Sequence, residues 1–103
     1  MPENTEADRP SSIKHPIVGV GAVVLRDNSI LLIKRAKEPY KGQWSIPGGK
    51  VKWCESLQQA AEREILEETN VIIKAKQPVY TFEIITQQTP QQLTLLLMYS
   101  QII

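Results

Sequence analysis

The sequence predicts an α+β fold in which a mixed β-sheet packs on one helix. Apolar runs rich in Val and Ile, punctuated by turn-forming residues, lie on both sides of a single helical segment at 56–70. Within that segment apolar residues recur at helical spacing, so that one face is suited to a protein core. These residues are Leu57, Ala60, Ala61 and Ile65.

The part before the helix is predicted to contain a β-hairpin and a short strand. Residues 17–25, IVGVGAVVL, and residues 30–33 are apolar runs, and the intervening RDNS contains turn formers. A short strand at 44–46 leads into the tight loop 47–49, PGG. We interpret Trp44 as a core residue, with stacking on a base as the alternative. Residues 1–15 are rich in Glu, Asp, Ser and Pro and are predicted to be a disordered arm, which leaves a domain at 16–103.

The part after the helix is predicted to consist of strands. One begins at 71–73, and a second covers 79–86 after Pro78, which limits how central its ladder can be. The apolar segment 93–103 forms a final strand in a hairpin with its predecessor. It is too short for a membrane span, which needs about twenty residues.

Residue patterns in the sequence predict both ends of the helix and an acidic face on it. Ser56 with Gln59 forms a capping-box pattern, and Asn70 falls where a left-handed residue ends many helices. Glutamates at i, i+3 and i+4 share one face, where they repel one another and where a hard divalent cation relieves the conflict. These are Glu64, Glu67 and Glu68, and the alternative is an ordinary solvated face.

The spacing in the segment 49–71 resembles the Nudix box. In that box a glycine, five residues, a glutamate and seven residues precede Arg-Glu-aliphatic-x-Glu-Glu-x-Gly-aliphatic. The resemblance extends over about 17–71, and Asn70 departs from it where the family has glycine. The matching positions are Gly49, Glu55, Arg63, Glu64, Ile65, Glu67, Glu68 and Val71.

The resemblance implies a sheet sandwiched between helices and Mg²⁺- or Mn²⁺-dependent hydrolysis of a pyrophosphate linkage in a nucleoside diphosphate derivative. We expect the substrate to be of the ADP-ribose or nucleoside triphosphate type. The resemblance implies metal ligation by the three glutamates and the Gly48 carbonyl, with Glu55 and Arg63 orienting the ligands. The general base is either a box glutamate or a residue in a later loop.

Four residues are candidates for substrate contacts. Lys34 and Arg35 follow an apolar strand at an edge that faces substrate in the family, and a solvated strand end is the alternative. Trp53 precedes the helix in a region that is often exposed, and the backbone of Gly49 is suited to close approach by a phosphate.

Composition restricts the partners and the compartment. A net charge of +1 offers no electrostatic case for bulk nucleic-acid or membrane binding, so we expect a small nucleotide as the partner. The single cysteine, Cys54, excludes an internal disulfide and fits a reducing compartment, and the polar N-terminus is unlike a signal peptide. We therefore expect a cytoplasmic protein.

The chain is short at its C-terminus relative to the family. The sheet would lack cover over Leu93, Leu95 and Leu97 and would leave an exposed edge. We therefore expect a homodimer, formed by strand pairing or hairpin exchange, or a shortened version of a longer domain. The shortness also favours the rival function, a catalytically weak or inactive Nudix-like nucleotide-binding module, whereas three clustered carboxylates argue against it.

Overall fold

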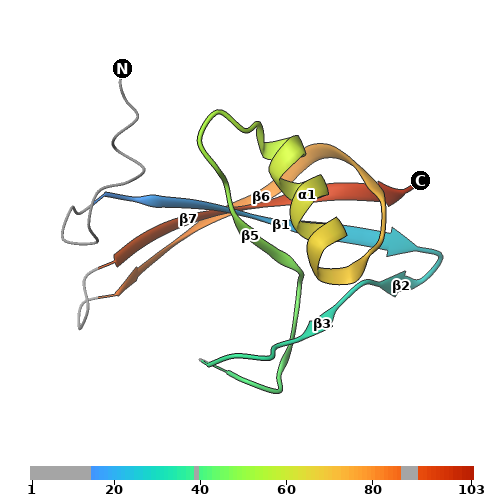
Figure 1. Cartoon of the computed structure of the whole chain (residues 1–103), viewed down its shortest axis with the longest axis horizontal. Helices are drawn as coiled ribbons and strands as arrows, with labels where there is room; N and C mark the ends of the chain where they lie inside the picture. The colour runs from blue at the N-terminus through green and yellow to red at the C-terminus, as the bar shows by residue number, and fades with distance from the viewer. Residues whose placement is uncertain (1–14, 39, 87–90) are drawn as a thin grey trace.

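The computed structural model describes residues 15–38, 40–86 and 91–103, without the side chains of Thr86 and Gln91. Of the predicted arm at 1–15, all but His15 lies outside the described residues. The elements follow one another along the chain as shown in Figure 1. They are β1 (Ile17–Arg26), β2 (Ser29–Ile30), β3 (Ile33–Lys34), β4 (Trp44–Ser45), β5 (Gly48–Lys50), α1 (Leu57–Thr69), β6 (Ile73–Thr86) and β7 (Gln91–Ile102).

The main sheet is mixed, as the sequence predicts. Its strand order is β2-β1-β7-β6, and β5 pairs with β1 in addition. The long strands β1 and β7 run parallel, whereas β6 and β7 form an antiparallel hairpin and β5 runs antiparallel to β1. The helix α1 lies against one face of this sheet (Figure 1). The predicted hairpin of the last two strands is confirmed, and β7 lies inside the sheet because it also pairs with β1.

Both helix ends form as the sequence predicts. The Oγ atom of Ser56 accepts a hydrogen bond from the Gln59 N–H at 3.0 Å, and the Gln59 side chain accepts one from the Ser56 N–H at 2.9 Å. Asn70 ends the helix in the left-handed region with φ 62°, and its N–H bonds to the Leu66 carbonyl. Each bond satisfies a backbone group that a helix end otherwise leaves unpaired.

The core lies between α1 and the sheet. Three residues of the predicted stripe are buried, and Leu57 is partly buried against them. The sheet contributes alternate residues of β1 and β7, as expected for strands with one buried face. Besides Gly19 and Gly21, the buried residues on these three elements are Ala60, Ala61, Ile65, Val20, Ala22, Val24, Met98 and Ser100.

Four details differ from the sequence prediction. Gly48 and Gly49 of the predicted loop at 47–49 belong to the strand β5, which pairs with β1. The second strand of the first hairpin is split, because Ile30 pairs with β1 whereas Ile33 pairs with Ser45 of β4. The prediction of a core Trp44 is wrong, since 64% of the residue is exposed on the short β3–β4 ribbon. The two strands predicted around Pro78 form one strand, β6, and the proline coincides with its register shifts.

The outer edge of the main sheet is formed by β6. Among the described residues this strand pairs with β7 alone. Lysines, a proline and bulges are common devices that protect such an edge from further pairing, and β6 contains Lys74, Lys76, Pro78 and two register shifts. The homodimer expected from the sequence stays a prediction. In the described part of the chain, no helix has the length and apolar character needed to cross a bilayer.

Candidate active site

The strand β5 brings two glycines against the acidic face of α1. The Gly48 N–H donates a hydrogen bond to Oε1 of Glu68 at 2.9 Å. Gly49 lies so close to the Glu64 carboxylate that a Cβ atom at this position would collide with it. The absence of a side chain at Gly49 thus lets β5 approach Glu64, whereas a Cβ atom at Gly48 would collide with the backbone of β1 instead.

Arg63 is the centre of the ionic contacts on this face. Its Nε and Nη2 atoms donate to the two oxygens of Glu55 at 2.6 and 3.0 Å, which is a bidentate contact. Its Nη1 atom donates to Glu64 at 2.9 Å and to Glu67 at 3.2 Å. Nη2 also donates to the Lys50 carbonyl at 3.0 Å. One guanidinium thus ties the helix to β5 and to the loop that precedes the helix.

These contacts shift the ionisation of the pair that Arg63 forms with Glu55. The hydrogen bonds from Arg63 and from the Lys52 N–H lower the pKa of Glu55 from 4.5 to about 2. The same pairing with Glu55 raises the pKa of the Arg63 guanidinium above its ordinary value. The side chains of Glu55 and Arg63 are 13% and 21% exposed, so this ion pair is better shielded from water than a surface pair.

Glu68 has the opposite shift. Burial raises its pKa above 4.5, and the charges of Glu64 and Glu67 act in the same direction, while the Gly48 N–H and Arg35 act against it. The carboxylate is thus costly to ionise where it stands. A cation bound at this face would offset part of that cost.

The carboxylate oxygens of this face suit a hard divalent cation, and Arg63 competes with such an ion for two of the carboxylates. Glu64, Glu67 and Glu68 present carboxylate oxygens on one helix face, the ligands that Mg²⁺ prefers. Across 15–38, 40–86 and 91–103, however, no three acidic, His or Cys side chains converge into a ready-made metal cluster. Arg63 already bonds to Glu64 and Glu67, so coordination by these two requires them to share or exchange that partner.

The substrate candidates lie in two places. Arg35 is half-buried and close enough to Glu68 for its charge to lower the pKa of that carboxylate. Lys34 is exposed on β3 and pairs with Trp44, so the two side chains share one face of the ribbon, and alternation places Arg35 on the other face. Trp53 is 74% exposed in the loop before α1, and Gly49 lies at the acidic face. Gly49 and Arg35 therefore lie near the glutamates.

Sequence reasoning missed the backbone groups of this site. The Lys50 carbonyl and the Lys52 N–H bond to Arg63 and Glu55, and any residue type could provide them, so no sequence signal identifies them. Glu62 was also missed. Its carboxylate accepts a hydrogen bond from the Ala75 N–H at 2.9 Å and so ties α1 to β6.

Comparison with known proteins identifies relatives of this chain. The sequence profile of the NUDIX domain matches residues 15–95. An ADP-ribose pyrophosphatase of Methanocaldococcus jannaschii is 48% identical over 62 residues, which cover 60% of this chain and 37% of that protein. A CTP pyrophosphohydrolase of Escherichia coli strain K12 is 43% identical over 53 residues, which cover 50% of this chain and 39% of that protein. The matched segments thus span less than half of either relative.

A solved structure supports the same relationship. The crystal structure of a MutT NUDIX hydrolase from Burkholderia pseudomallei superposes with a TM-score of 0.78 at 34% sequence identity, covering 85% of this chain and 68% of that chain. This likeness confirms the predicted α+β fold, and the profile match confirms the resemblance drawn from the spacing of the box.

Proposed function

The chain belongs to the Nudix family, and on that premise we propose that it hydrolyses the pyrophosphate linkage of a nucleoside diphosphate derivative with Mg²⁺ or Mn²⁺ as cofactor. Nudix hydrolases act on small nucleotide substrates and generally use divalent metals. The observation that carries the proposal is the glutamate face of α1, held against the bare backbone of Gly48 and Gly49. We include in the proposal a cytoplasmic location, which is consistent with the single, unpaired Cys54.

The glutamates are proposed to hold the cation and, through it, the diphosphate. Glu64, Glu67 and Glu68 provide carboxylate oxygens, and the Gly48 carbonyl is a further candidate ligand. Attack of water on a diphosphate adds negative charge to a group that is already anionic. A bound divalent cation supplies neutralisation of that charge and activation of water.

Arg63 is proposed as a positioning residue. Its bidentate contact with Glu55 fixes the guanidinium, and its Nη1 atom holds Glu64 and Glu67 on the same side of the helix. Ligands held in this way lose less conformational freedom when a cation binds. Glu55 acts through Arg63, because its own carboxylate contacts the guanidinium and the Lys52 N–H.

The substrate is proposed to be of the ADP-ribose or nucleoside triphosphate type. The Methanocaldococcus relative supports the first and the Escherichia relative supports the second. Arg35 lies near Glu68, where a cation can contact a substrate phosphate. Lys34 is a second phosphate candidate, and the exposed ring of Trp53 is proposed to stack on the base.

A second candidate function is a nucleotide-binding module that is catalytically weak or inactive. The observation that favours it is the bonding of Arg63 to Glu64 and Glu67, which occupies oxygens that a cation needs. The two functions differ in turnover, while both require nucleotide binding.

One assay separates the two. The chain is incubated with ADP-ribose or CTP and excess MgCl₂ or MnCl₂, and AMP or CMP is measured by chromatography. Hydrolysis is expected, with loss of product on chelation by EDTA and in Glu68→Gln. Binding without product, detected by calorimetry with the same two nucleotides, would support the inactive module. Neither binding nor product would contradict both functions.

A further inference from the structure

Glu62 makes a hydrogen bond that belongs neither to the acidic face of α1 nor to a helix end. Its Oε2 atom accepts the N–H of Ala75 at 2.9 Å. Ala75 lies on β6 and is 4% exposed, so this bond lies beside the core between α1 and the sheet. The strand β6 is 14 residues long and pairs with β7 along most of its length. The bond therefore anchors α1 to a long strand with an extended ladder.

Glu62 and its neighbour Arg63 anchor α1 at opposite sides of the sheet. Arg63 donates to the Lys50 carbonyl on β5 at 3.0 Å, whereas Glu62 bonds to β6. The strand β5 pairs with β1, and β1, β7 and β6 follow in that order, so two strands separate the anchors. Neighbouring strands lie about 4.8 Å apart, which places β5 and β6 roughly 14 Å apart. Two anchors at this separation oppose rotation of the helix about its axis.

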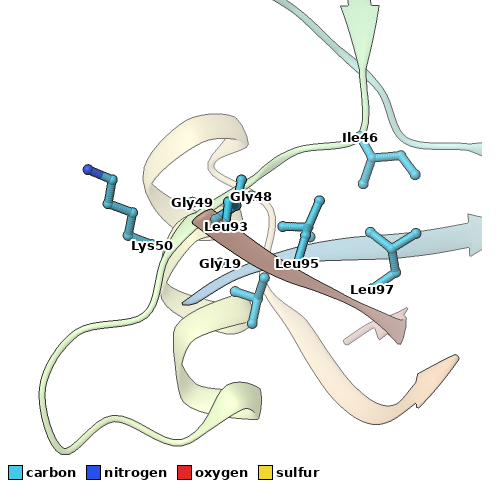
Figure 2. A pocket seen from close by; sticks show the side chains of 10 residues that line it. Gly19, Ile46, Gly48, Gly49, Lys50, Leu93, Leu95 and Leu97 are labelled. Carbon is cyan, nitrogen blue, oxygen red and sulfur yellow. The ribbon is translucent and has the colours of Figure 1, made fainter. Parts of the chain in front are cut away.

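The packing between α1 and the sheet defines this rotation only weakly. The buried side chains of α1 are those of Ile65 and of two alanines, Ala60 and Ala61, which are too small to interlock with the strands. Figure 2 shows Gly48 and Gly49, which have no side chains, next to each other on β5. At these two positions β5 offers the helix backbone atoms alone. The hydrogen bonds on the two flanks therefore have the larger part in setting the rotation.

A small rotation of α1 is enough to disturb the acidic face. Helix side chains end about 5–6 Å from the helix axis, so a rotation of about 10° moves their ends by about 1 Å. Glu68 accepts the Gly48 N–H at 2.9 Å, and Glu64 lies directly against Gly49. Ligand distances in metal sites are constrained to within about 0.2 Å. A displacement several times larger than this tolerance would weaken the binding of a cation.

We propose that Glu62 is a positioning residue for the metal site: its bond to Ala75 fixes the rotation of α1 and thereby the places of Glu64 and Glu68 against β5. This role rests on the proposed function, in which these glutamates hold a divalent cation. Glu62 bonds to β6 and is not itself a ligand of that cation. Two of its properties can affect a cation, namely the hydrogen bond and the negative charge, and substitution separates the two.

Two variants keep the hydrogen bond apart from the charge. Glu62→Gln and Glu62→Ala both remove the negative charge, but the glutamine amide oxygen still accepts the Ala75 N–H. Glutamine and alanine are good helix formers, so both variants retain α1. The Kd of Mn²⁺ for the full chain is measured by electron paramagnetic resonance of the free ion. We expect Glu62→Ala to weaken Mn²⁺ binding about tenfold, as loss of a group that orients metal ligands does, and Glu62→Gln to bind nearly as tightly as the unaltered chain.

Amide hydrogen exchange at Ala75, followed by NMR, reports whether the bond itself is lost. Exchange is expected to be faster in Glu62→Ala and close to that of the unaltered chain in Glu62→Gln. The matched control is Ile73→Val, which deletes a buried methyl group from β6 and keeps both Glu62 and the Ala75 N–H. This control lowers the Tm but is expected to bind Mn²⁺ as the unaltered chain does. It separates a loss of ligand position from a general loss of stability.

Three outcomes would overturn this role of Glu62 while leaving the proposed function intact. Equal Mn²⁺ affinity in Glu62→Ala and the unaltered chain would show that the bond does not position the ligands. An equal loss in Glu62→Ala and Glu62→Gln would assign the effect to charge, and a similar loss in Ile73→Val would assign it to stability. Absence of Mn²⁺ binding by the unaltered chain would instead contradict the proposed metal site itself, and the role of Glu62 with it.

Discussion

A methyl group added at Gly48 tests how closely β5 must approach β1. A Cβ atom at this position would collide with the Val20 carbonyl oxygen and lie 2.7 Å from the Gly21 Cα atom. Both atoms belong to the backbone of β1, which cannot rotate away as a side chain can. Gly48→Ala therefore forces the two strands apart and strains the hydrogen bond from Gly48 to Glu68.

The loss of stability in Gly48→Ala can be estimated from the cost of inserting extra atoms into a tightly packed structure. Such insertions cost about 1–3 kcal/mol in the free energy of unfolding. For a domain of this length, each 1 kcal/mol lowers the Tm by roughly 4–8 °C. The Tm of Gly48→Ala, measured by circular dichroism, is therefore expected to be at least about 4 °C below that of the unaltered chain.

Gly49→Ala is the matched comparison. Its added Cβ atom would collide with the Glu64 carboxylate, which is the far end of a flexible side chain. The carboxylate can move aside, so Gly49→Ala is expected to lose less stability than Gly48→Ala and to lose turnover because Glu64 is displaced. A larger loss of Tm in Gly49→Ala than in Gly48→Ala would refute the reasoning.

Four further predictions concern the charges and the end of α1. Glu67→Gln and Glu68→Gln should each lose most turnover at limiting Mg²⁺ with the fold retained, and wild-type-like rates in both would rule out the proposed metal ligands. The pKa of Glu68 is raised in the folded chain, so its contribution to stability is present below pH 4.5 and is lost as pH rises through the raised pKa. In urea unfolding, Glu68→Gln should therefore be more stable than the unaltered chain at pH 7 but not at pH 4. For Glu55 the pKa is lowered to about 2, so its contribution is present above pH 4.5 and lost as pH falls towards 2, and a Glu55→Gln variant should lack that acid-dependent loss. Asn70 has φ 62°, so Asn70→Gly should be neutral or mildly stabilising and Asn70→Val should cost about 1 kcal/mol or more, whereas equal Tm values would show that the left-handed position is not limiting.

The helix could be predicted from sequence because its signals are local. The capping box, the apolar stripe and the left-handed end each depend on residues within a few turns of one another. The position of β7 depends instead on pairing between segments far apart in the chain. No local pattern indicates that 91–102 runs parallel to β1 and so lies inside the sheet.

Trp44 shows a second limit of sequence reasoning. The alternation with Ser45 predicts a strand correctly, and the size and apolarity of the indole favour burial. Burial also needs a neighbouring layer, and a single strand's sequence does not show which layers the fold supplies. The ribbon of β3 and β4 pairs apart from the main sheet, so the indole remains exposed.

The contacts of Arg63 explain how a face with three neighbouring glutamates is compatible with a folded helix. Like charges at i, i+3 and i+4 destabilise a helix, and Arg63 offsets this by bonding to two of the three, Glu64 and Glu67. Glu68 makes its hydrogen bond with Gly48 instead, and its pKa remains raised. The repulsion within this helix face is therefore offset by Arg63 at Glu64 and Glu67. In the proposed function, a bound cation would offset the repulsion that remains at Glu68.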